Sequence, residues 1–270
     1  MVAQAKAALP DLAVSIKGLV KIYAGNKANR TPKLALDHVD LDIPRGGIFG
    51  LLGPNGAGKS TTFKMLCGLL KPTAGEAHVV GHDLRRATGA AKSRLGYMAQ
   101  KFSLYGLLSV QQNLEFSAGV YGLEGNTRRE RIAEMIETFD LGDWLSATPD
   151  SLPLGHKQRL ALACSLMHRP PVLFLDEPTS GVDPITRREF WTHINGLARK
   201  GVTIMVTTHF MDEAEYCDRV AMLSRARLIA LDTPDALKRA AANVEHPDPT
   251  MEDAFIHLVE SADRQMEVAA

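Results

Sequence analysis

The sequence of 270 residues is poor in the features that mark secreted, membrane-spanning and nucleic-acid-binding proteins. Its three cysteines are odd in number and far apart, which argues against a disulfide framework. No apolar run approaches the ~18 residues that a membrane span needs, and the first residues lack the apolar region of a signal peptide. Basic and acidic residues balance at 31 each, so no excess of positive charge points to a nucleic-acid partner.

What is present is an ordinary globular composition, with 45% hydrophobic and 23% charged residues. We therefore expect a cytosolic protein with one good core or two small ones, and any membrane role would have to go through a partner. Residues 1–11 include an alanine-rich start and are expected to form a flexible lead-in.

Two kinds of apolar pattern divide the chain. Residues 14–23 and 39–43 alternate between apolar and polar positions, as half-buried antiparallel strands do. Residues 48–52, 172–175 and 202–206 are instead nearly continuous apolar runs, which indicate parallel strands covered on both faces. Because ligands bind beyond the carboxyl ends of such strands, the polar clusters that begin at Gly53, Asp176 and Thr207 should meet around one ligand.

Three helical regions are expected around these strands. The first covers residues 61–70, and the second covers residues 109–146, with its clearest amphipathic segment at 128–139. The third opens the C-terminal tail, where Thr250 and Asp253 have the spacing of a capping box.

The segment after the first apolar run fits the phosphate-binding pattern G-x-x-x-x-G-K-[ST]. It consists of Gly53, Pro54, Asn55, Gly56, Ala57, Gly58, Lys59 and Ser60, and Thr61 begins the expected helix. Glycines let successive amide groups turn toward phosphate oxygens, and the helix N-terminus adds positive potential. Lys59 is then expected to neutralise the β- and γ-phosphates of a nucleotide, and Ser60 to bind magnesium.

Three more polar residues follow the other two apolar runs. Asp176 ends its run, where a carboxylate beside a phosphate loop holds magnesium directly or through water. Glu177 comes next and is placed to polarise a water molecule aimed at the γ-phosphate, and His209 could donate to that phosphate. The alternatives are a solvated turn for the two carboxylates and a structural role for the histidine.

Together these motifs resemble the nucleotide-binding subunits of ABC transporters, over about residues 12–259. Residues 53–60 match the family's Walker A motif, residues 174–179 match Walker B with its catalytic glutamate, and residues 180–183 match the D-loop, which ends at Asp183. The resemblance implies an α/β fold, with a P-loop NTPase core built on a mostly parallel sheet, an N-terminal antiparallel β subdomain and an inserted α-helical subdomain. We expect the ATPase domain at 12–245, its helical subdomain at about 101–165, and a helical tail at 246–270.

The same resemblance implies roles for single residues, with ATP and Mg²⁺ as the ligands. His209 matches the switch histidine, and Gln100 matches the Q-loop glutamine that links magnesium and water to the transmembrane partner. Tyr23 matches the aromatic residue that stacks on adenine, although it could instead be a core tyrosine.

One loop departs from the family pattern. Where the family has Leu-Ser-Gly-Gly-Gln, which caps the ATP held by the opposite subunit, this chain has Leu152, Pro153, Leu154, Gly155 and His156. Pro153 removes a hydroxyl that would donate to a charged phosphate, a bond worth about 1.5–3 kcal/mol. Gly155 and the positive end of the following helix are retained, and His156 is either a replacement donor or an ordinary surface residue. We therefore expect a modified but active site.

Within the family, residues 206–219 and 250–255 resemble bacterial drug-resistance exporters. This implies an ATPase that powers an exporter through a second cassette, identical or different, and a separate membrane permease of the ABC-2 type. It also implies a cytoplasmic position on the inner face of the plasma membrane. A soluble ABC ATPase and a scaffold that senses nucleotide without hydrolysis stay open as alternatives, and the chain could be one half of a longer two-cassette protein.

The residues after Gln100 are unusually apolar for a free loop. They are expected either to form part of a socket for a cytoplasmic helix of the permease or to pack inside the helical subdomain. Exposed apolar patches usually mark interaction sites, so exposure would favour the socket. The residues concerned are Phe102, Leu104, Tyr105, Leu107 and Leu108.

Overall fold

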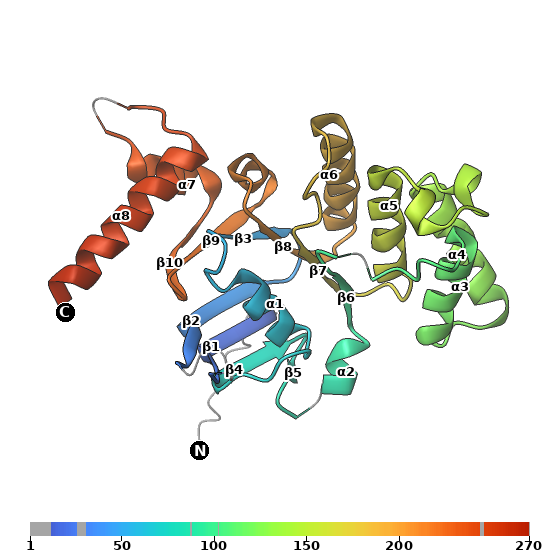
Figure 1. Cartoon of the computed structure of the whole chain (residues 1–270), viewed down its shortest axis with the longest axis horizontal. Helices are drawn as coiled ribbons and strands as arrows, with labels where there is room; N and C mark the ends of the chain where they lie inside the picture. The colour runs from blue at the N-terminus through green and yellow to red at the C-terminus, as the bar shows by residue number, and fades with distance from the viewer. Residues whose placement is uncertain (1–11, 26–30, 87, 102, 244–245, 270) are drawn as a thin grey trace, which may run out of the picture.

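The computed structural model describes residues 12–25, 31–86, 88–101, 103–243 and 246–269, so the expectation for residues 1–11 lies outside the described part. The molecule is elongated, with two sheets in the middle and helices at both ends (Figure 1). At one end lie α3 (Val110–Val120), α4 (Gly125–Thr138) and α5 (Leu154–Ser165). At the other end lie α7 (Pro234–Ala241) and α8 (Met251–Ala269).

The larger sheet has six strands in the order β10-β9-β3-β8-β7-β6. All neighbouring pairs are parallel except β10 and β9. Every residue of β3, β7 and β8 is buried, as expected for continuous apolar runs covered on both faces. The strands are β3 (Ile48–Leu52), β6 (Leu95–Met98), β7 (Val172–Asp176), β8 (Thr203–Thr208), β9 (Arg219–Ser224) and β10 (Arg227–Asp232).

The smaller sheet is antiparallel, in the order β2-β1-β4-β5. It contains the two strands expected near the N-terminus, but the second of them begins well before residue 39. The alternation of β1 and β2 is interrupted where the pairing shifts register between Ile16 and Leu19, and again between Leu19 and Lys21, opposite His38 with a φ of 46°. The strands are β1 (Leu12–Tyr23), β2 (Lys33–Pro44), β4 (Ala74–Val79) and β5 (His82–Asp83).

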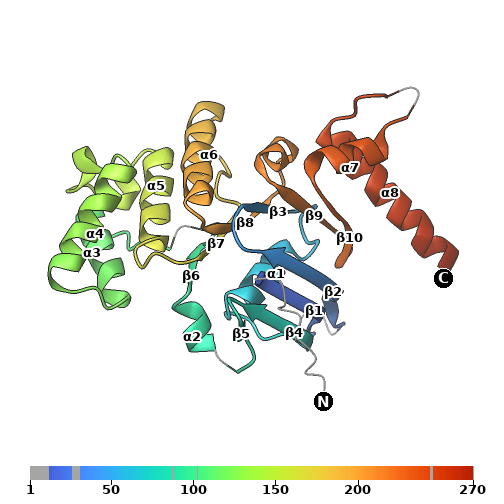
Figure 2. The same ribbon diagram turned by 180° about the vertical axis from the view of Figure 1, so that it is seen from behind.

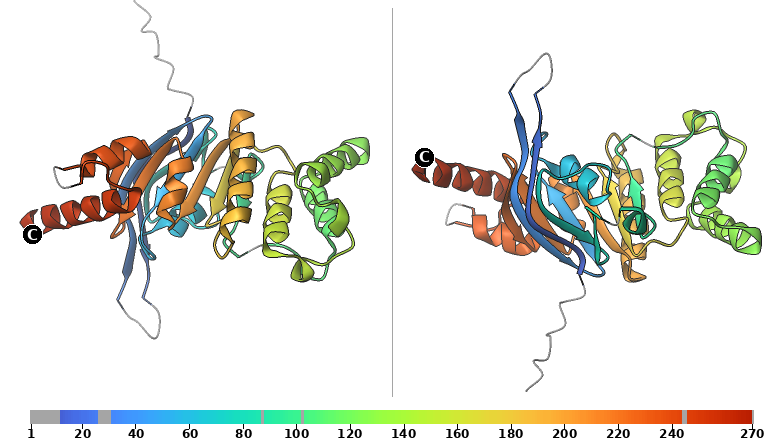
Figure 3. Two further views of the ribbon diagram at one scale, coloured as in Figure 1. Left: turned by 90° about the horizontal axis from the view of Figure 1, so that it is seen from above. Right: turned by 90° about the horizontal axis from the view of Figure 1, so that it is seen from below.

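The six-stranded sheet separates two hydrophobic cores. Successive residues of a strand point to opposite faces, so Ile48 and Leu52 enter one core while Phe49 and Leu51 enter the other. The first core includes residues of α3, α4, α5 and α6 (Pro184–Arg199), and Figure 3 shows α6 lying across the sheet. The second core includes residues of both sheets and of α1 (Lys59–Leu66), which lies between them (Figure 2).

The helices differ from the sequence expectation at their ends. The helix expected at 61–70 is α1, which stops at Leu66 because Gly68 has a φ of 65° and the next two amides turn back to Lys64. The region expected at 109–146 is broken after α3, where Gly122 has a φ of 69°. The capping box of the tail is confirmed, since the Thr250 and Asp253 side chains each accept from the other's backbone amide.

The α/β fold class is confirmed by these sheets and helices. The remaining helical elements are short. Within the described residues no helix is both long enough and apolar enough to span a membrane. The domain boundaries given above stay a prediction. The short elements are α2 (Thr88–Lys92), η1 (Gly142–Trp144), η2 (Pro149–Ser151) and η3 (Met211–Tyr216).

Candidate functional site

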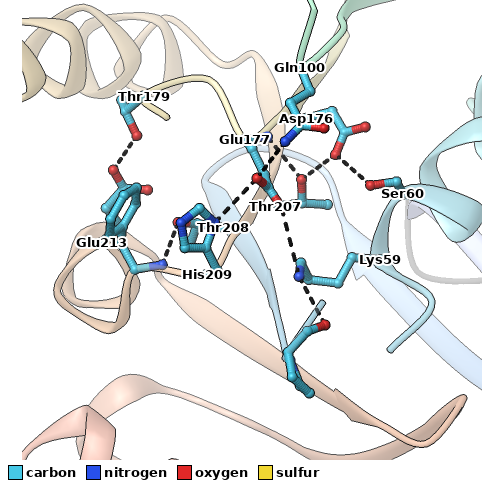
Figure 4. Close-up of polar contacts among 12 residues, drawn as sticks. Lys59, Ser60, Gln100, Asp176, Glu177, Thr179, Thr207, Thr208, His209 and Glu213 are labelled. Atoms are coloured by element: carbon cyan, nitrogen blue, oxygen red, sulfur yellow. Dashed lines mark hydrogen bonds and ion pairs between the residues drawn. The ribbon is translucent and has the colours of Figure 1, made fainter. Parts of the chain in front are cut away.

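The carboxyl ends of β3, β7 and β8 meet, as the parallel-sheet interpretation predicts, and bring Lys59, Asp176 and His209 into one group (Figure 4). The loop after β3 leads into α1, so the first amide groups of that helix face the same side as the ends of β7 and β8. The polar side chains of three separate segments therefore surround one space.

The loop from Gly53 to Gly58 wraps around the side chain of Lys59. The Lys59 ammonium donates to the carbonyls of Gly53 at 2.7 Å and Pro54 at 3.3 Å, and the side chain is only 4% exposed. Gly58 has a φ of 113°, and a Cβ there would lie 2.6 Å from the carbonyl oxygen of Ala35. A residue with a side chain therefore fits neither the backbone angle nor the space.

Asp176 lies at the end of β7, beside the start of α1. Its Oδ1 accepts from the Ser60 hydroxyl at 3.2 Å and from the Thr207 hydroxyl at 2.6 Å, and the residue is 3% exposed. The Thr207 hydroxyl in turn accepts from the Glu177 amide at 3.0 Å. The alternative of a solvated turn is therefore wrong, because this carboxylate is buried and fixed by hydroxyl donors.

Glu177 presents one carboxylate to three donors from different segments. Its Oε2 accepts from the Gln100 amide at 2.9 Å and lies 3.2 Å from His209 Nδ1, while its Oε1 lies 3.8 Å from Lys59 Nζ. Glu177 also has a φ of 48°, a left-handed conformation that is uncommon for a residue with a side chain. Such backbone strain is found at functional sites, where the surrounding structure holds it in place.

The electrostatics of the group centre on Lys59. Burial lowers the pKa of its ammonium from the ordinary value, and the nearby carboxylates of Glu177 and Asp176 partly offset that effect. The two carboxylates thus stabilise a buried cation whose hydrogen bonds go to the backbone carbonyls of Gly53 and Pro54.

Several residues of this group line an open cavity of about 460 Å³. Its wall includes Tyr23, Lys33, Ala35, Asn55, Gly56, Gly58, Lys59, Ser60, Thr61, Gln100 and Glu177. Tyr23 is 38% exposed, and its hydroxyl lies 3.3 Å from that of Thr61, so the alternative of a core tyrosine is wrong.

The group also fits a magnesium ion, because magnesium prefers oxygen ligands and keeps several of its waters. Ser60 supplies an oxygen in the wall of the cavity, and Asp176 supplies a second oxygen next to it. The Gln100 side chain, beyond the end of β6, is held near them by its bond to Glu177. The remaining positions would be filled by phosphate oxygens and water.

The loop at 152–156 lies in a different place, where it lines a separate cleft of about 350 Å³ together with Asp183 and Gly181. Pro153 precedes the first residue of α5 and is exposed, and a Cβ on Gly155 would meet the Thr186 methyl group at 2.4 Å. Asp183 caps α6 by accepting from the amides of residues 185 and 186.

Gly155, His156 and Asp183 line this cleft and do not line the phosphate cavity, and their role toward a partner's ATP stays a prediction. The His156 ring lies 4.9 Å from the Trp144 ring, so this side chain packs within the helical end of its own chain.

The sequence did not identify two residues as parts of the site. Thr207, which links Asp176 to Glu177, was predicted only as the start of a polar cluster. Gln158, fully buried, donates to the carbonyl of Pro178 beside Glu177.

Comparison with known proteins finds relatives among ABC transporter ATP-binding proteins. A sequence model of the family described as "ABC transporter" matches residues 36–180. The chain is 65% identical over 231 residues to the probable multidrug ABC transporter ATP-binding protein YbhF of Escherichia coli (strain K12), covering 86% of this chain and 40% of that protein. It is 39% identical over 230 residues to the daunorubicin/doxorubicin resistance ATP-binding protein DrrA of Streptomyces peucetius, covering 85% of this chain and 68% of that protein.

Solved structures agree with the sequence relatives. A structure described as the ATP-binding subunit of an ABC transporter superposes with a TM-score of 0.77 at 28% identity, over 92% of this chain and 99% of the other. A dimeric cassette in a post-hydrolysis state with ADP and Pi has a TM-score of 0.74 at 26% identity, over 82% and 98%. The chain spans only 40% of the length of the Escherichia coli relative. Since the family match covers 145 of the 270 residues, and the fold and the site agree with it, this chain belongs to the ABC transporter family.

Proposed function

We propose that the chain binds and hydrolyses ATP and thereby powers a membrane exporter. The observation that carries the proposal is the carboxylate of Glu177, which lies one residue beyond Asp176 and is held by Lys59, Gln100 and His209. A carboxylate fixed at the rim of a phosphate cavity is placed to accept a proton from an attacking water molecule. Two relatives, a probable multidrug ABC transporter ATP-binding protein and a daunorubicin/doxorubicin resistance ATP-binding protein, support the exporter.

The polar residues in and beside the cavity have separate roles in this proposal. Lys59 moves from its carbonyl acceptors to the β- and γ-phosphates, and the Gly53–Gly58 loop supplies amide donors. Ser60, Asp176 and Gln100 hold magnesium, which shields the phosphate charges when it is bound. Glu177 orients the attacking water and takes its proton, while His209 hydrogen-bonds the γ-phosphate. Tyr23 stacks on the adenine ring at the exposed mouth of the cavity.

The proposal includes a second cassette, identical or different, that closes head to tail on this one. Gly155 and Asp183 line a cleft separate from the chain's own cavity, so they are available to an ATP molecule held by a partner. The amides at the start of α5 offer the donors that such a phosphate needs. Two of the similar solved structures are themselves described as dimeric.

The membrane partner is proposed to be a permease of the ABC-2 type, which would hold this chain on the cytoplasmic face of the plasma membrane. The support comes from the loop and helix after Gln100. Leu107 is 97% exposed, Val120 is 63% exposed and Tyr105 is 51% exposed, and Tyr105 and Val120 border a cavity of about 270 Å³. Leu104 instead packs partly on the core, and Phe102 lies outside the described residues.

Steady-state ATPase activity of the purified chain tests the proposal. We expect magnesium-dependent turnover in the unaltered chain and none in Lys59→Ala, because that variant removes the cation that faces the phosphates. ATP binding with no turnover under any condition would favour the nucleotide-sensing scaffold instead. Co-purification with a permease, followed by cysteine cross-linking from Leu107, tests the coupling to transport separately.

A further inference from the structure

Glu213 is a charged residue that the proposed hydrolysis does not use. It lies in η3, four positions after His209, and is 0% exposed. Moving a carboxylate out of water is strongly unfavourable unless cations and donors compensate. The neighbours of this side chain therefore decide what it does.

Two side chains compensate the buried carboxylate. The Thr179 hydroxyl donates to Glu213 Oε1, and Arg187 Nε lies 3.6 Å from the same oxygen. Among the residues that the structure describes, Glu213 Oε2 has no hydrogen-bond partner. Arg187 also lies 3.3 Å from Asp212 Oδ2, and its guanidinium carbon stands 4.1 Å from the centre of the Phe210 ring, a cation–π distance.

These contacts join the two loops that carry the reacting groups. Thr179 is two residues after Glu177, while Phe210 follows His209 directly and their rings are 4.2 Å apart. Figure 4 shows the Thr179–Glu213 pair beside His209, with Glu177 on the other side of the histidine. The buried carboxylate thus connects the turn at 177–179 with the loop at 209–213, and Arg187 connects both to α6.

We propose that Glu213 is a positioning residue for ATP hydrolysis, which through Thr179 and Arg187 fixes His209 against Glu177. The inference rests on the proposed function, because it gives a reason for the 3.2 Å spacing of that pair. Glu177 has a left-handed backbone, and such a conformation persists only where its surroundings hold it. Thr179 does not line the phosphate cavity, so its bond to Glu213 acts on geometry and leaves nucleotide contacts intact.

The matched pair Thr179→Val and Thr179→Ser tests this proposal. Valine keeps the shape of threonine and loses the hydroxyl, whereas serine keeps the hydroxyl and loses a methyl group. We expect kcat to fall by about tenfold in Thr179→Val, as for one lost hydrogen bond to a charged group, and by less than about twofold in Thr179→Ser. ATP affinity should stay within about twofold in both variants.

A second comparison separates positioning from plain stabilisation. In a His209→Ala background the pair to be positioned is gone, so Thr179→Val should cause no further loss of kcat. Equal losses in both backgrounds, or losses that follow the melting temperature, would overturn the proposal. If Thr179→Val does not fold, Glu213→Gln tests the other half of the link, because it keeps an oxygen for the Thr179 hydroxyl and removes the charge that faces Arg187. We expect it to lower kcat in the unaltered background and to cause no further loss in the His209→Ala background.

A readout that needs no turnover keeps this proposal distinct from the proposed function. The ring signals of His209, assigned by their absence in His209→Ala, can be followed by NMR in the full chain. We expect Thr179→Val to shift or broaden them and Thr179→Ser to leave them in place. Unchanged signals in Thr179→Val would overturn the positioning role, whereas an unaltered chain that shows no ATPase activity would overturn only the hydrolytic function.

Discussion

Two loops of this molecule lead into helices whose first amides can bind an anion, and they differ in what surrounds them. The loop before α1 is enclosed, since Lys59 is 4% exposed and Asp176, 3% exposed, borders the same group. The loop before α5 lies open, because Pro153 and Leu154 are exposed and line a cleft whose charged residues are Arg159, Asp183 and Glu189, with no lysine among them.

The difference indicates how each loop works. The loop before α1 has its cation, its hydroxyls and its carboxylates within one chain, so it can bind phosphate without help. The loop before α5 presents backbone amides, but the phosphate that would accept from them has to come with a partner chain. Damage to the enclosed loop should therefore appear in the isolated subunit, and damage to the open loop should appear only where two subunits meet.

The largest effect is expected from Glu177→Gln. The amide keeps the shape of the side chain but cannot take a proton, so turnover should fall by about 10²–10⁴-fold, the usual contribution of a general base. Binding of MgATP should stay normal, because Lys59, Ser60 and Asp176 are unchanged, and ATP-bound dimers should accumulate. Steady-state ATPase rates and size-exclusion chromatography with ATP measure both effects.

The matched control for that change is Glu137→Gln on the exposed side of α4, which alters the same chemical group away from the site. It should leave turnover within about twofold, as surface changes usually do. Hydrolysis at a near-normal rate in Glu177→Gln would remove this glutamate from its role as the base.

The next effect is expected from Gly155→Glu, in the open loop. A carboxylate there would face the phosphate of a partner's ATP, and like charges brought together cost several kcal/mol, so hydrolysis should fall by roughly a hundredfold. ATP affinity of the isolated monomer, measured by calorimetry at low protein concentration, should be nearly unchanged. Badly weakened monomer binding would show that the loop belongs to its own subunit's pocket, against the comparison drawn above.

Gly155 needs a control because a Cβ at this position meets the Thr186 methyl group at 2.4 Å. Gly155→Ala carries that contact without the charge, and combining it with Thr186→Ser removes the methyl group. If the double variant hydrolyses ATP normally while Gly155→Glu does not, the carboxylate is the cause. If Gly155→Ala alone abolishes hydrolysis and Thr186→Ser does not restore it, the loss has another origin.

Much of the enclosed site could be predicted from the sequence because its signals are local and its parts meet by a general rule. A continuous apolar run followed by a glycine-rich loop specifies a strand, a turn and a helix, and parallel strands bring their ends together. Thr207 and Gln158 were missed because their partners, Asp176 and Pro178, are distant in sequence. Glu213 was missed for a similar reason, since its burial depends on α6 and on the turn after β7.

The open loop could be placed only through the family resemblance. The sequence of residues 152–156 does not by itself predict that the loop lies apart from the phosphate cavity, because the position of the loop depends on how α5 packs. The strands β1 and β2 show a second limit: bulges near Gly18 and His38 break the alternation, so a pattern of period two finds only part of β2. Helix α1 ended early because Gly68 adopts a positive φ, which a glycine allows but does not require.

A third prediction concerns His168, which connects the helical end of the molecule, made of α3, α4 and α5, to the six-stranded sheet. Its ring stacks on Tyr121 with centroids 3.6 Å apart, and its Nε2 donates to the Leu95 carbonyl at 3.0 Å. Burial lowers the pKa of His168 to about 4, although the bond to Leu95 acts in the opposite direction. The unfolded chain binds this proton near the ordinary pKa of 6.5, so stability should be complete above that pH and should fall as the pH drops toward 4.

The loss should amount to at most about 3 kcal/mol over that range, from the difference between the two pKa values. Urea unfolding at a series of pH values measures it, and His168→Phe is the control, because phenylalanine keeps the stacking and cannot titrate. The variant should show a flatter pH dependence. The same slope in the variant and the unaltered chain would mean that other groups cause the acid sensitivity.

The smallest effect is expected from Pro153→Ser, which makes the open loop more like the family pattern. Serine restores a hydroxyl that could donate to a partner's phosphate, and it can also cap α5, which now starts without a side-chain cap. It loses the restraint that proline places on φ, which is −53° here, and thus loosens the loop in the unbound chain. Because these effects oppose each other, turnover should change by less than about tenfold, or ~1.4 kcal/mol. A larger rise in ATPase activity, with ATP affinity of the monomer unchanged, would mean that the missing hydroxyl alone limits closure on the partner's ATP.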